Sequence, residues 1–236
     1  MDAMKWFLIK LSKLLVFSAF LSATSPAQAG TVIVPGVSGG GFMVKVTSVK
    51  EARFRSTILQ QYDFSCGSAA LATLLTYHYE DKVSEQDVFK FMFDTGDQEK
   101  IRKNGFSLLD MKNYLEANGY RAAGYQITLD KLAEIGVPAI VLINIKGYKH
   151  FVVVKGISAK MVLLSDPAAG ARTIPRAEFE SMWNGLIFII LNKKNVAKNH
   201  FNRDQEWHVK EKAPLGLALN ARELANVTLM LPGVLR

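Results

Sequence analysis

The sequence contains a single cysteine, Cys66, in 236 residues. A lone cysteine excludes a disulfide framework and any CxxC zinc or redox motif. No segment recurs at a fixed period, and glycine and proline, at 17 and 7 residues, are at ordinary levels, which excludes collagen-like and solenoid repeats. With 49% hydrophobic and 21% charged residues, the composition is typical of a folded globular chain with a buried core.

Long apolar runs are also scarce. The run at residues 14–23 is about half the ~20 residues that a membrane-spanning helix needs. Three lysines precede it: Lys5, Lys10 and Lys13. Ala27-Gln28-Ala29 follows with the small-x-small pattern of a signal-peptidase site, and no cysteine near it permits lipoprotein processing. We therefore predict a signal peptide at residues 1–29 that is removed on export; an uncleaved anchor is the weaker alternative.

The formal net charge is +8 at pH 7. Positive charge is concentrated in residues 193–236, which begin with Lys193-Lys194. This segment is expected to be a solvated extension, with contact to an anionic membrane surface or an acidic partner as the alternative. Its last part, residues 213–236, fits either a strand or a capped helix. Nucleic-acid binding is not expected, because the region before it is nearly neutral and lacks a basic stripe with interleaved aromatic residues.

The part after the predicted signal peptide divides into three segments. Residues 30–49 form the mature N-terminal segment, in which 30–41 is expected to be flexible and 42–49 to be a strand. Residues 50–192 form one domain, and residues 193–236 form the basic C-terminal extension.

Helices are expected in the first half of this domain. Small and apolar residues run on from Cys66, and Ser84 and Ser107 each precede an aspartate by three residues, as in a capping box. Thr128 caps a further short helix that Gly136 closes. The expected helices span about residues 66–79, 85–93, 107–118 and 129–135.

Strands are expected in the second half, where continuous apolar runs are rich in β-branched residues. Residues 175–183 interrupt them with a predicted helix that has Pro175 at its first position. Helices followed by an antiparallel sheet indicate an α+β domain in two lobes. The expected strands span residues 139–144, 150–155, 161–165 and 186–191.

Cys66 is either a buried, inert side chain or a reactive thiol. Free cysteine is among the most buried residue types, which favours the first alternative. Cys66, however, begins a predicted helix, Gly67 is expected to leave the approach to it open, and the helix N-terminus favours a thiolate. We therefore predict a nucleophile at Cys66.

A cysteine nucleophile needs a base to accept its proton. His150 opens an apolar strand after a glycine-containing turn, at an expected edge of the sheet. His78 lies twelve residues after Cys66 on the same predicted helix, more than three turns away. His200 and His208 lie in the charged extension, where they are surface residues or a weak metal pair. His150 is the best candidate for the base.

Two further residues complete a candidate site. Asp166 ends the strand after that of His150, and a hairpin through residues 158–160 makes the two strands antiparallel neighbours. A carboxylate beside the second imidazole nitrogen fixes the tautomer, although an Asp-Pro step is by itself also a common turn. Gln60, six residues before Cys66, has an amide that suits an oxyanion donor.

Three segments in this order resemble motifs of the C39 peptidases, papain-like cysteine peptidases best known as the leader-removing domains of bacteriocin ABC exporters. Residues 60–72 (QQYDFSCGSAALA) are similar to the nucleophile motif, and residues 147–154 (GYKHFVVV) to the histidine motif. Residues 165–170 (SDPAAG) are similar to the Asp-Pro turn of the family. The resemblance covers roughly residues 50–192.

The resemblance implies a papain-like fold, a helical lobe followed by an antiparallel sheet lobe, with no metal or other cofactor. It also implies one role for each site residue: Cys66 as nucleophile, His150 as general base and acid, Asp166 as orienting carboxylate and Gln60 as oxyanion donor.

The chain departs from the bacteriocin exporters, because no transmembrane bundle and no GxxxxGKS/T phosphate loop follows the peptidase region. A signal peptide, a stand-alone domain and a basic tail resemble instead the exported C39 peptidases of functional-amyloid (Fap) operons. That resemblance implies a periplasmic enzyme that cleaves after small residues. Its substrate would be a peptide or an unfolded exported protein, such as an amyloid subunit or an outer-membrane secretion component.

Two other functions fit the same residues. A transferase or amidase that forms an acyl-cysteine is one, because the site specifies acyl chemistry and not the acceptor. A catalytically silent chaperone that holds peptides on the same fold is the other. Loss of function in Cys66→Ala would exclude the chaperone, and mass spectrometry of the products would separate hydrolysis from transfer.

Overall fold

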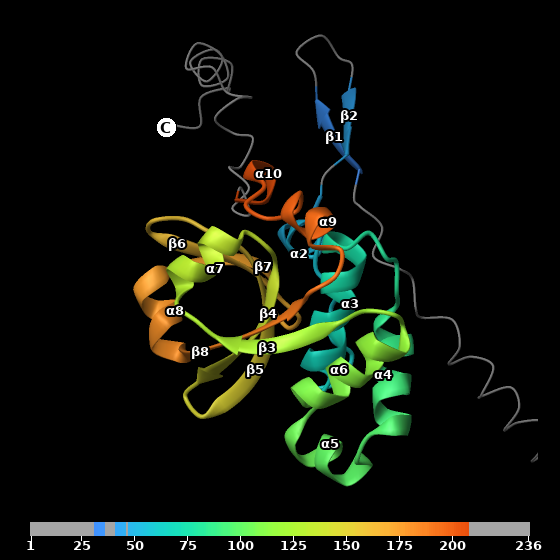
Figure 1. The fold of residues 1–236 in the computed structure, drawn as a ribbon. Helices are drawn as coiled ribbons and strands as arrows, with labels where there is room; N and C mark the ends of the chain where they lie inside the picture. The colour runs from blue at the N-terminus through green and yellow to red at the C-terminus, as the bar shows by residue number, and fades with distance from the viewer. Residues whose placement is uncertain (1–30, 36–40, 46, 208–236) are drawn as a thin grey trace, which may run out of the picture. The chain divides into compact units, whose positions relative to one another are not determined.

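The computed structural model describes residues 31–35, 41–45 and 47–207 (Figure 1). The predicted signal peptide and the extension beyond residue 207 lie outside the described residues. The chain forms two compact units, Met1–Ser48 and Val49–Arg236. The first contains a hairpin, and the second contains every other described helix and strand.

The hairpin of the first unit consists of β1 (Thr31–Pro35) and β2 (Gly41–Lys45), paired in antiparallel fashion. The expectation of a flexible segment at residues 30–41 is therefore wrong for β1, whose β-branched Thr-Val-Ile-Val run pairs with β2. The expected strand at residues 42–49 ends at Lys45, because the helix α2 already begins at Val49.

The first part of the second unit forms helices, and one of them, α3, is buried along its first ten residues, Cys66–Leu75. Small side chains dominate these positions, so neighbouring elements can approach the helix closely. An additional helix, α5, was not expected from the sequence; the side chain of Asp97 caps it by accepting from the backbone N–H of Lys100. These elements are α2 (Val49–Arg53), α3 (Cys66–His78), α4 (Glu85–Thr95), α5 (Gln98–Asn104) and α6 (Leu108–Ala117).

Side-chain caps begin three of the helices as expected. Ser84 accepts from the backbone N–H of Asp87 at the start of α4, and Ser107 forms a complete capping box with Asp110 at the start of α6. Thr128 caps α7 (Leu129–Ile135), and Gly136 ends it in the left-handed conformation. The local sequence thus determines where these helices begin.

The sheet of the second unit has six antiparallel strands in the order β3-β8-β4-β5-β6-β7. Figure 1 shows α3 to α6 on one side of it and α7 and α8 on the other. The predicted α+β class is confirmed. The strands are β3 (Ala122–Gln126), β4 (Ala139–Ile145), β5 (Tyr148–Ile157), β6 (Met161–Asp166), β7 (Gly170–Pro175) and β8 (Trp183–Ile190).

Both outer strands, β3 and β7, were missed by the sequence analysis. β3 has the sequence AAGYQ and β7 has GARTIP, so neither carries the dense β-branched pattern of the central strands. Pro175 is the N-cap residue of α8 (Arg176–Met182). The sequence predicted it at the first helical position, one residue further along the helix, and this is wrong. β8 begins at Trp183, three residues earlier than expected.

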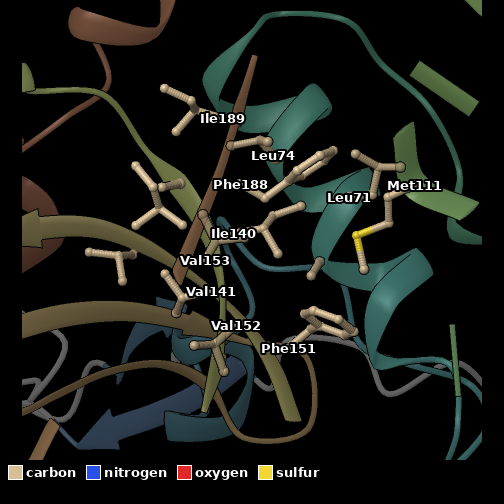
Figure 2. Close-up of a cluster of buried hydrophobic side chains, with 14 of the residues drawn as sticks. Leu71, Leu74, Met111, Ile140, Val141, Phe151, Val152, Val153, Phe188 and Ile189 are labelled. Carbon is tan, nitrogen blue, oxygen red and sulfur yellow. The ribbon is translucent and has the colours of Figure 1, made fainter. Parts of the chain in front are cut away.

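The main core lies between α3 and the central strands of the sheet. The helix α3 contacts β4, β5 and β6. Figure 2 shows Leu71 and Leu74 of α3 beside apolar side chains of β4, β5 and β8, with Met111 of α6 nearby. β5 is buried on both faces from His150 onward, as its unbroken apolar run predicts. This packing holds the start of α3 close to the start of β5.

The first part of the predicted C-terminal extension is not a solvated tail. It forms α9 (Lys194–Lys198) and α10 (Asp204–Trp207), and Ala197 is fully buried. Asn202 accepts from the backbone N–H of Ile157 at 2.7 Å and donates its own backbone N–H to the carbonyl of Lys155. Within the described residues, no helix has the length and apolarity needed to cross a membrane.

Candidate active site

Cys66 is the first residue of α3, as predicted, and the residue is 6% exposed. The N-cap residue, Ser65, makes no side-chain cap; its hydroxyl bonds instead to the backbone of Tyr62. The N–H groups of the first helical turn therefore lack the usual capping side chain and keep their partial positive charge beside the thiol.

Gly67 has a different role from the one expected. A Cβ atom at this position would lie 2.8 Å from Cε of Met111 and 3.0 Å from Cβ of Phe106. Such distances are shorter than normal contacts, so glycine allows α3 to pack against Met111 of α6 and against Phe106 in the segment before that helix. Gly67 is buried, and the expectation that it opens the approach to the thiol is wrong.

His150 and Asp166 lie together where the hairpin prediction placed them. β5 and β6 are antiparallel neighbours, joined through residues 158–160. Nε2 of His150 and Oδ1 of Asp166 are 2.7 Å apart, and both side chains are almost fully buried. Nδ1 of His150 is also buried and makes no hydrogen bond to the described part of the chain. This leaves Nδ1 for the thiol proton.

Asp166 is held as a carboxylate by several donors. Its Oδ1 accepts from the backbone N–H of Ala168 at 2.9 Å, and its Oδ2 accepts from Nε of Arg172 at 3.1 Å. Nη2 of Arg172 lies 2.9 Å from the same Oδ2. Burial tends to raise the pKa of Asp166, but the hydrogen bond with His150, the backbone donors and Arg172 lower it overall.

Arg172 was not identified from the sequence. It lies on β7, after the turn that follows Asp166, and two nitrogens of its guanidinium, Nε and Nη2, lie within 3.1 Å of the same oxygen, Oδ2. Arg172 could have been found by predicting that the residues after the Asp-Pro turn form a strand paired with β6. The sequence did not predict that strand.

The pKa of His150 is raised to about 9. Burial alone would lower it, but the hydrogen bond with Asp166, the interaction with the neighbouring thiol of Cys66, and the negative charge that both groups carry when ionised outweigh burial. The imidazolium is therefore the favoured form at neutral pH, next to the thiol. Structure and electrostatics bring together three of the four predicted site residues: Cys66, His150 and Asp166.

Gln60 is engaged with its own loop. Its Nε2 donates to the carbonyl of Tyr62 at 3.0 Å and, more weakly, to that of Asp63 at 3.5 Å. Both amide hydrogens are thus directed at loop carbonyls, so donation to an oxyanion requires the weaker bond to be exchanged. The hydroxyl of Tyr148 donates to the same Asp63 carbonyl at 3.1 Å and links this loop to β5.

Two cavities meet at Cys66. The larger has a volume of about 780 Å³ and lies between the loop before α3, the end of α5 and the start of β5. The smaller, of about 410 Å³, is bounded mainly by apolar side chains, among them Leu108, Leu142 and Phe151. The two cavities adjoin, because both are lined by Cys66, Asn104, Gly105 and Lys149.

The other histidines lie away from this site. His78, the last residue of α3, is fully buried, and neither of its ring nitrogens is hydrogen-bonded to a described residue. Burial, together with the charge of Lys155, lowers its pKa to about 3. His200 is 3.0 Å from Oε1 of Glu80, and His208 lies outside the described residues. Within the described ranges, no cluster of three or more His, Cys, Asp or Glu side chains forms a metal site.

Comparison with known proteins defines the class of this chain. The sequence model of the Peptidase C39 family matches residues 55–195. The chain belongs to this family and is a cysteine peptidase with the papain-like α+β fold. The match contains every residue of the predicted site.

Two relatives carry the same printed name, "Probable functional amyloid protease FapD". The protein from Pseudomonas aeruginosa is 42% identical over 180 residues, which cover 76% of this chain and 80% of the relative. The protein from Pseudomonas fluorescens is 42% identical over 174 residues, which cover 73% and 77%. Among solved structures, the peptidase domain of Streptococcus ComA, a bifunctional ABC transporter, matches with a TM-score of 0.50 at 21% identity. The match covers 57% of this chain and 96% of that domain, and it supports the fold alone.

Proposed function

We propose that this peptidase is exported and cleaves a peptide bond in an exported partner, with Cys66, His150 and Asp166 as its catalytic triad. The observation that carries the proposal is the 2.7 Å bond between His150 and Asp166 beside a thiol at the N-terminus of α3. Arg172 serves as a positioning residue, because its contacts are with the carboxylate of Asp166 and it acts on His150 only through that carboxylate.

The reaction begins when Sγ of Cys66 attacks the scissile carbonyl carbon and forms a C–S bond, while His150 holds the proton that left the thiol. His150 then gives this proton to the leaving amine as the C–N bond breaks. A water molecule next attacks the thioester and passes a proton to His150. The C–S bond breaks, and the proton returns to Cys66.

The carbonyl oxygen becomes negatively charged in both tetrahedral intermediates. The N–H groups at the start of α3 stand next to the thiol, and Gln60 supplies a side-chain donor once its bond to the Asp63 carbonyl is exchanged. Substrate binding would drive this exchange, since catalytic hydrogen bonds often become aligned only when the substrate is bound.

The substrate is an extended peptide segment with a small residue, as in Gly-Gly or Gly-Ala, before the cut. Support comes from the 6% exposure of Cys66, because a large side chain beside the scissile carbonyl would obstruct approach to so buried a thiol. The name that both FapD relatives carry supports a role in a functional-amyloid system. An amyloid subunit or a secretion component would then be the partner, and the signal peptide at residues 1–29 would deliver the enzyme to it.

The direct test incubates the purified chain from Gly30 onward, and its Cys66→Ala variant, with a peptide library. Mass spectrometry then maps the products. We expect cuts after small residues with the native chain and none with Cys66→Ala. A product whose mass includes one water molecule at the new carboxyl end identifies hydrolysis, whereas a product joined to a peptide amine would identify transfer. Cleavage that persists in Cys66→Ala would refute the proposed nucleophile.

A further inference from the structure

The larger of the two cavities at Cys66 has positively charged walls that come from separate elements. Arg102 and Lys103 lie in the last turn of α5, and Lys149 is the second residue of β5. All three side chains are exposed and line the cavity. Asp63 is the one carboxylate among the described residues that line it, and these residues together give the cavity a positive charge.

These positive charges are not used within the described part of the chain. Neither Lys103 nor Lys149 forms an ion pair there, and Arg102 stacks its guanidinium over Phe93, 5.0 Å from the ring centre, which leaves its charge uncompensated. Four other lysines on the helices do pair with a carboxylate of their own helix or its cap. The pairs are Lys90–Asp94, Lys100–Asp97, Lys112–Glu116 and Lys131–Glu134.

Helix stability explains only part of this arrangement. Basic residues in the last turn of α5 offset the negative end of the helix dipole, which accounts for Arg102 and Lys103. The helix dipole does not account for Lys149, which lies on a strand and directly precedes His150 in the sequence. Convergence of cations from a helix and a strand on a cavity that reaches Cys66 indicates a ligand with negative charge.

We propose that this cavity binds acidic side chains of the peptide substrate on one side of the cleaved bond. The proposal rests on the proposed peptidase function and adds the substrate class: a segment with Asp or Glu residues within a few positions of a small residue at the cut. The smaller, mainly apolar cavity, which adjoins the larger one at Cys66 and Lys149, receives an apolar residue of the same segment. Lys103 and Lys149 are the specificity-determining residues.

The test compares three peptides with the same Gly-Gly step, in which the flanking positions are Glu, Gln or Lys. Each peptide is made with the flanks before or after the step and is amidated at the C-terminus, so that side chains are its only carboxylates. We expect the native chain to cleave the Glu peptide with a kcat/KM about tenfold above that of the Gln peptide. This follows from a factor of up to roughly five for each exposed ion pair. The preference should weaken as salt is added.

Charge reversal locates the site. The Lys103→Glu/Lys149→Glu double variant should lose the preference for the Glu peptide and favour the Lys peptide. Lys103→Gln/Lys149→Gln should abolish the preference without reversing it. This neutral variant replaces the charge-reversed one in the test if circular dichroism shows that the latter does not fold. Lys100→Glu is the control: it lies on the same helix outside the cavity, where it pairs with Asp97, and it should leave the preference unchanged.

Binding of fluorescent peptides to Cys66→Ala separates recognition from catalysis. Tighter binding of the Glu peptide with no cleavage by the native chain would contradict the peptidase function and retain the acidic site. Equal cleavage and equal binding of the Glu and Gln peptides would overturn the acidic site and leave the peptidase function standing. A preference for Glu that survives in the double variants would also overturn it.

Discussion

At the scale of single residues, the chemistry depends on the proton held by His150. Asp166 accepts from its Nε2 and is itself held by Arg172, which orients the ring and leaves Nδ1 without a hydrogen bond in the described residues. The pKa of about 9 keeps the imidazolium at neutral pH, and the proton is lost as the pH rises through that value. The rate of peptide cleavage should therefore fall on the alkaline side near pH 9.

Asp166→Asn should move this alkaline limb to lower pH. The hydrogen bond and charge of Asp166 raise the pKa of His150, and an amide supplies neither the charge nor a fixed acceptor. We expect kcat to fall by more than in Gln60→Ala but to stay above that of Cys66→Ala or His150→Ala, in which turnover should be abolished. A pH–rate profile of kcat/KM measures both effects. An unchanged alkaline limb would contradict the pairing.

Cys66 should react quickly with iodoacetamide at pH 6 to 7, because the neighbouring His150 can take up the proton of the thiol. His150→Ala should slow this reaction. The rate of alkylation in both chains, followed by mass spectrometry, tests this. Alkylation that is equally fast in His150→Ala, or slow in the native chain, would restore the view of Cys66 as an inert buried side chain.

Gln60→Ala should retain the fold and lose on the order of 10² to 10³ in kcat through one missing oxyanion donor. Gln61 provides a matched control, because it neighbours Gln60 and its side chain contacts Gln86 on α4 instead of the loop at Tyr62. Gln61→Ala should be nearly fully active. Full activity in Gln60→Ala, with matching circular dichroism, would remove Gln60 from the mechanism.

At the scale of elements, a buried ion pair fastens α10 to β5. Nζ of Lys155 lies 3.0 Å from Oε2 of Glu206 and donates to Oγ of Ser56 at 2.8 Å, and the lysine side chain is completely buried. Burial lowers the pKa of Lys155, and the charge of Glu206 counteracts this effect. The segment of residues 194–207 is thus an integral part of the second unit.

Glu206→Gln should lower the free energy of unfolding by about 3 kcal/mol, because it leaves a buried lysine without its counter-charge. Glu80→Gln is the control: Glu80 pairs with His200 but is 69% exposed, and it should cost under about 1 kcal/mol. Urea unfolding at pH 7 measures both. A Glu206→Gln variant as stable as the native chain would show that solvent or rearrangement compensates the lysine.

At the scale of the whole molecule, two histidines give stability opposite dependences on pH. His78 has its pKa lowered from 6.5 to about 3, so the unfolded chain binds more protons and stability falls as the pH drops from about 6.5 towards 3. His150 has its pKa raised to about 9, so its contribution is complete below about pH 6.5 and is lost as the pH rises through about 9.

His78→Leu should flatten the acid side of this profile. Its ring nitrogens have no hydrogen-bond partner in the described residues, so an apolar side chain removes the titration without leaving a broken bond. Urea unfolding at pH 4, 5 and 7 should show a smaller loss of stability than in the native chain. An equally steep loss would mean that other groups, such as the paired carboxylates, dominate acid unfolding.

Local sequence signals determined much of this protein. Ser84, Ser107 and Thr128 cap helices through bonds that span three residues, so their neighbours suffice to predict them. The apolar runs of β4, β5 and β6 predicted buried strands, and a hairpin between two of them placed His150 beside Asp166. The resemblance to the motifs of the Peptidase C39 family predicted the class of the protein.

Tertiary structure alone decided the rest, because those features depend on contacts between residues far apart in the chain. β3 and β7 are strands because β8 and β6 supply their hydrogen bonds, not because their own side chains favour extension. Arg172 reaches Asp166 only once β7 has paired. Lys155 is buried only because α10 returns Glu206 to it, and nothing in the sequence near either residue specifies a partner about fifty positions away.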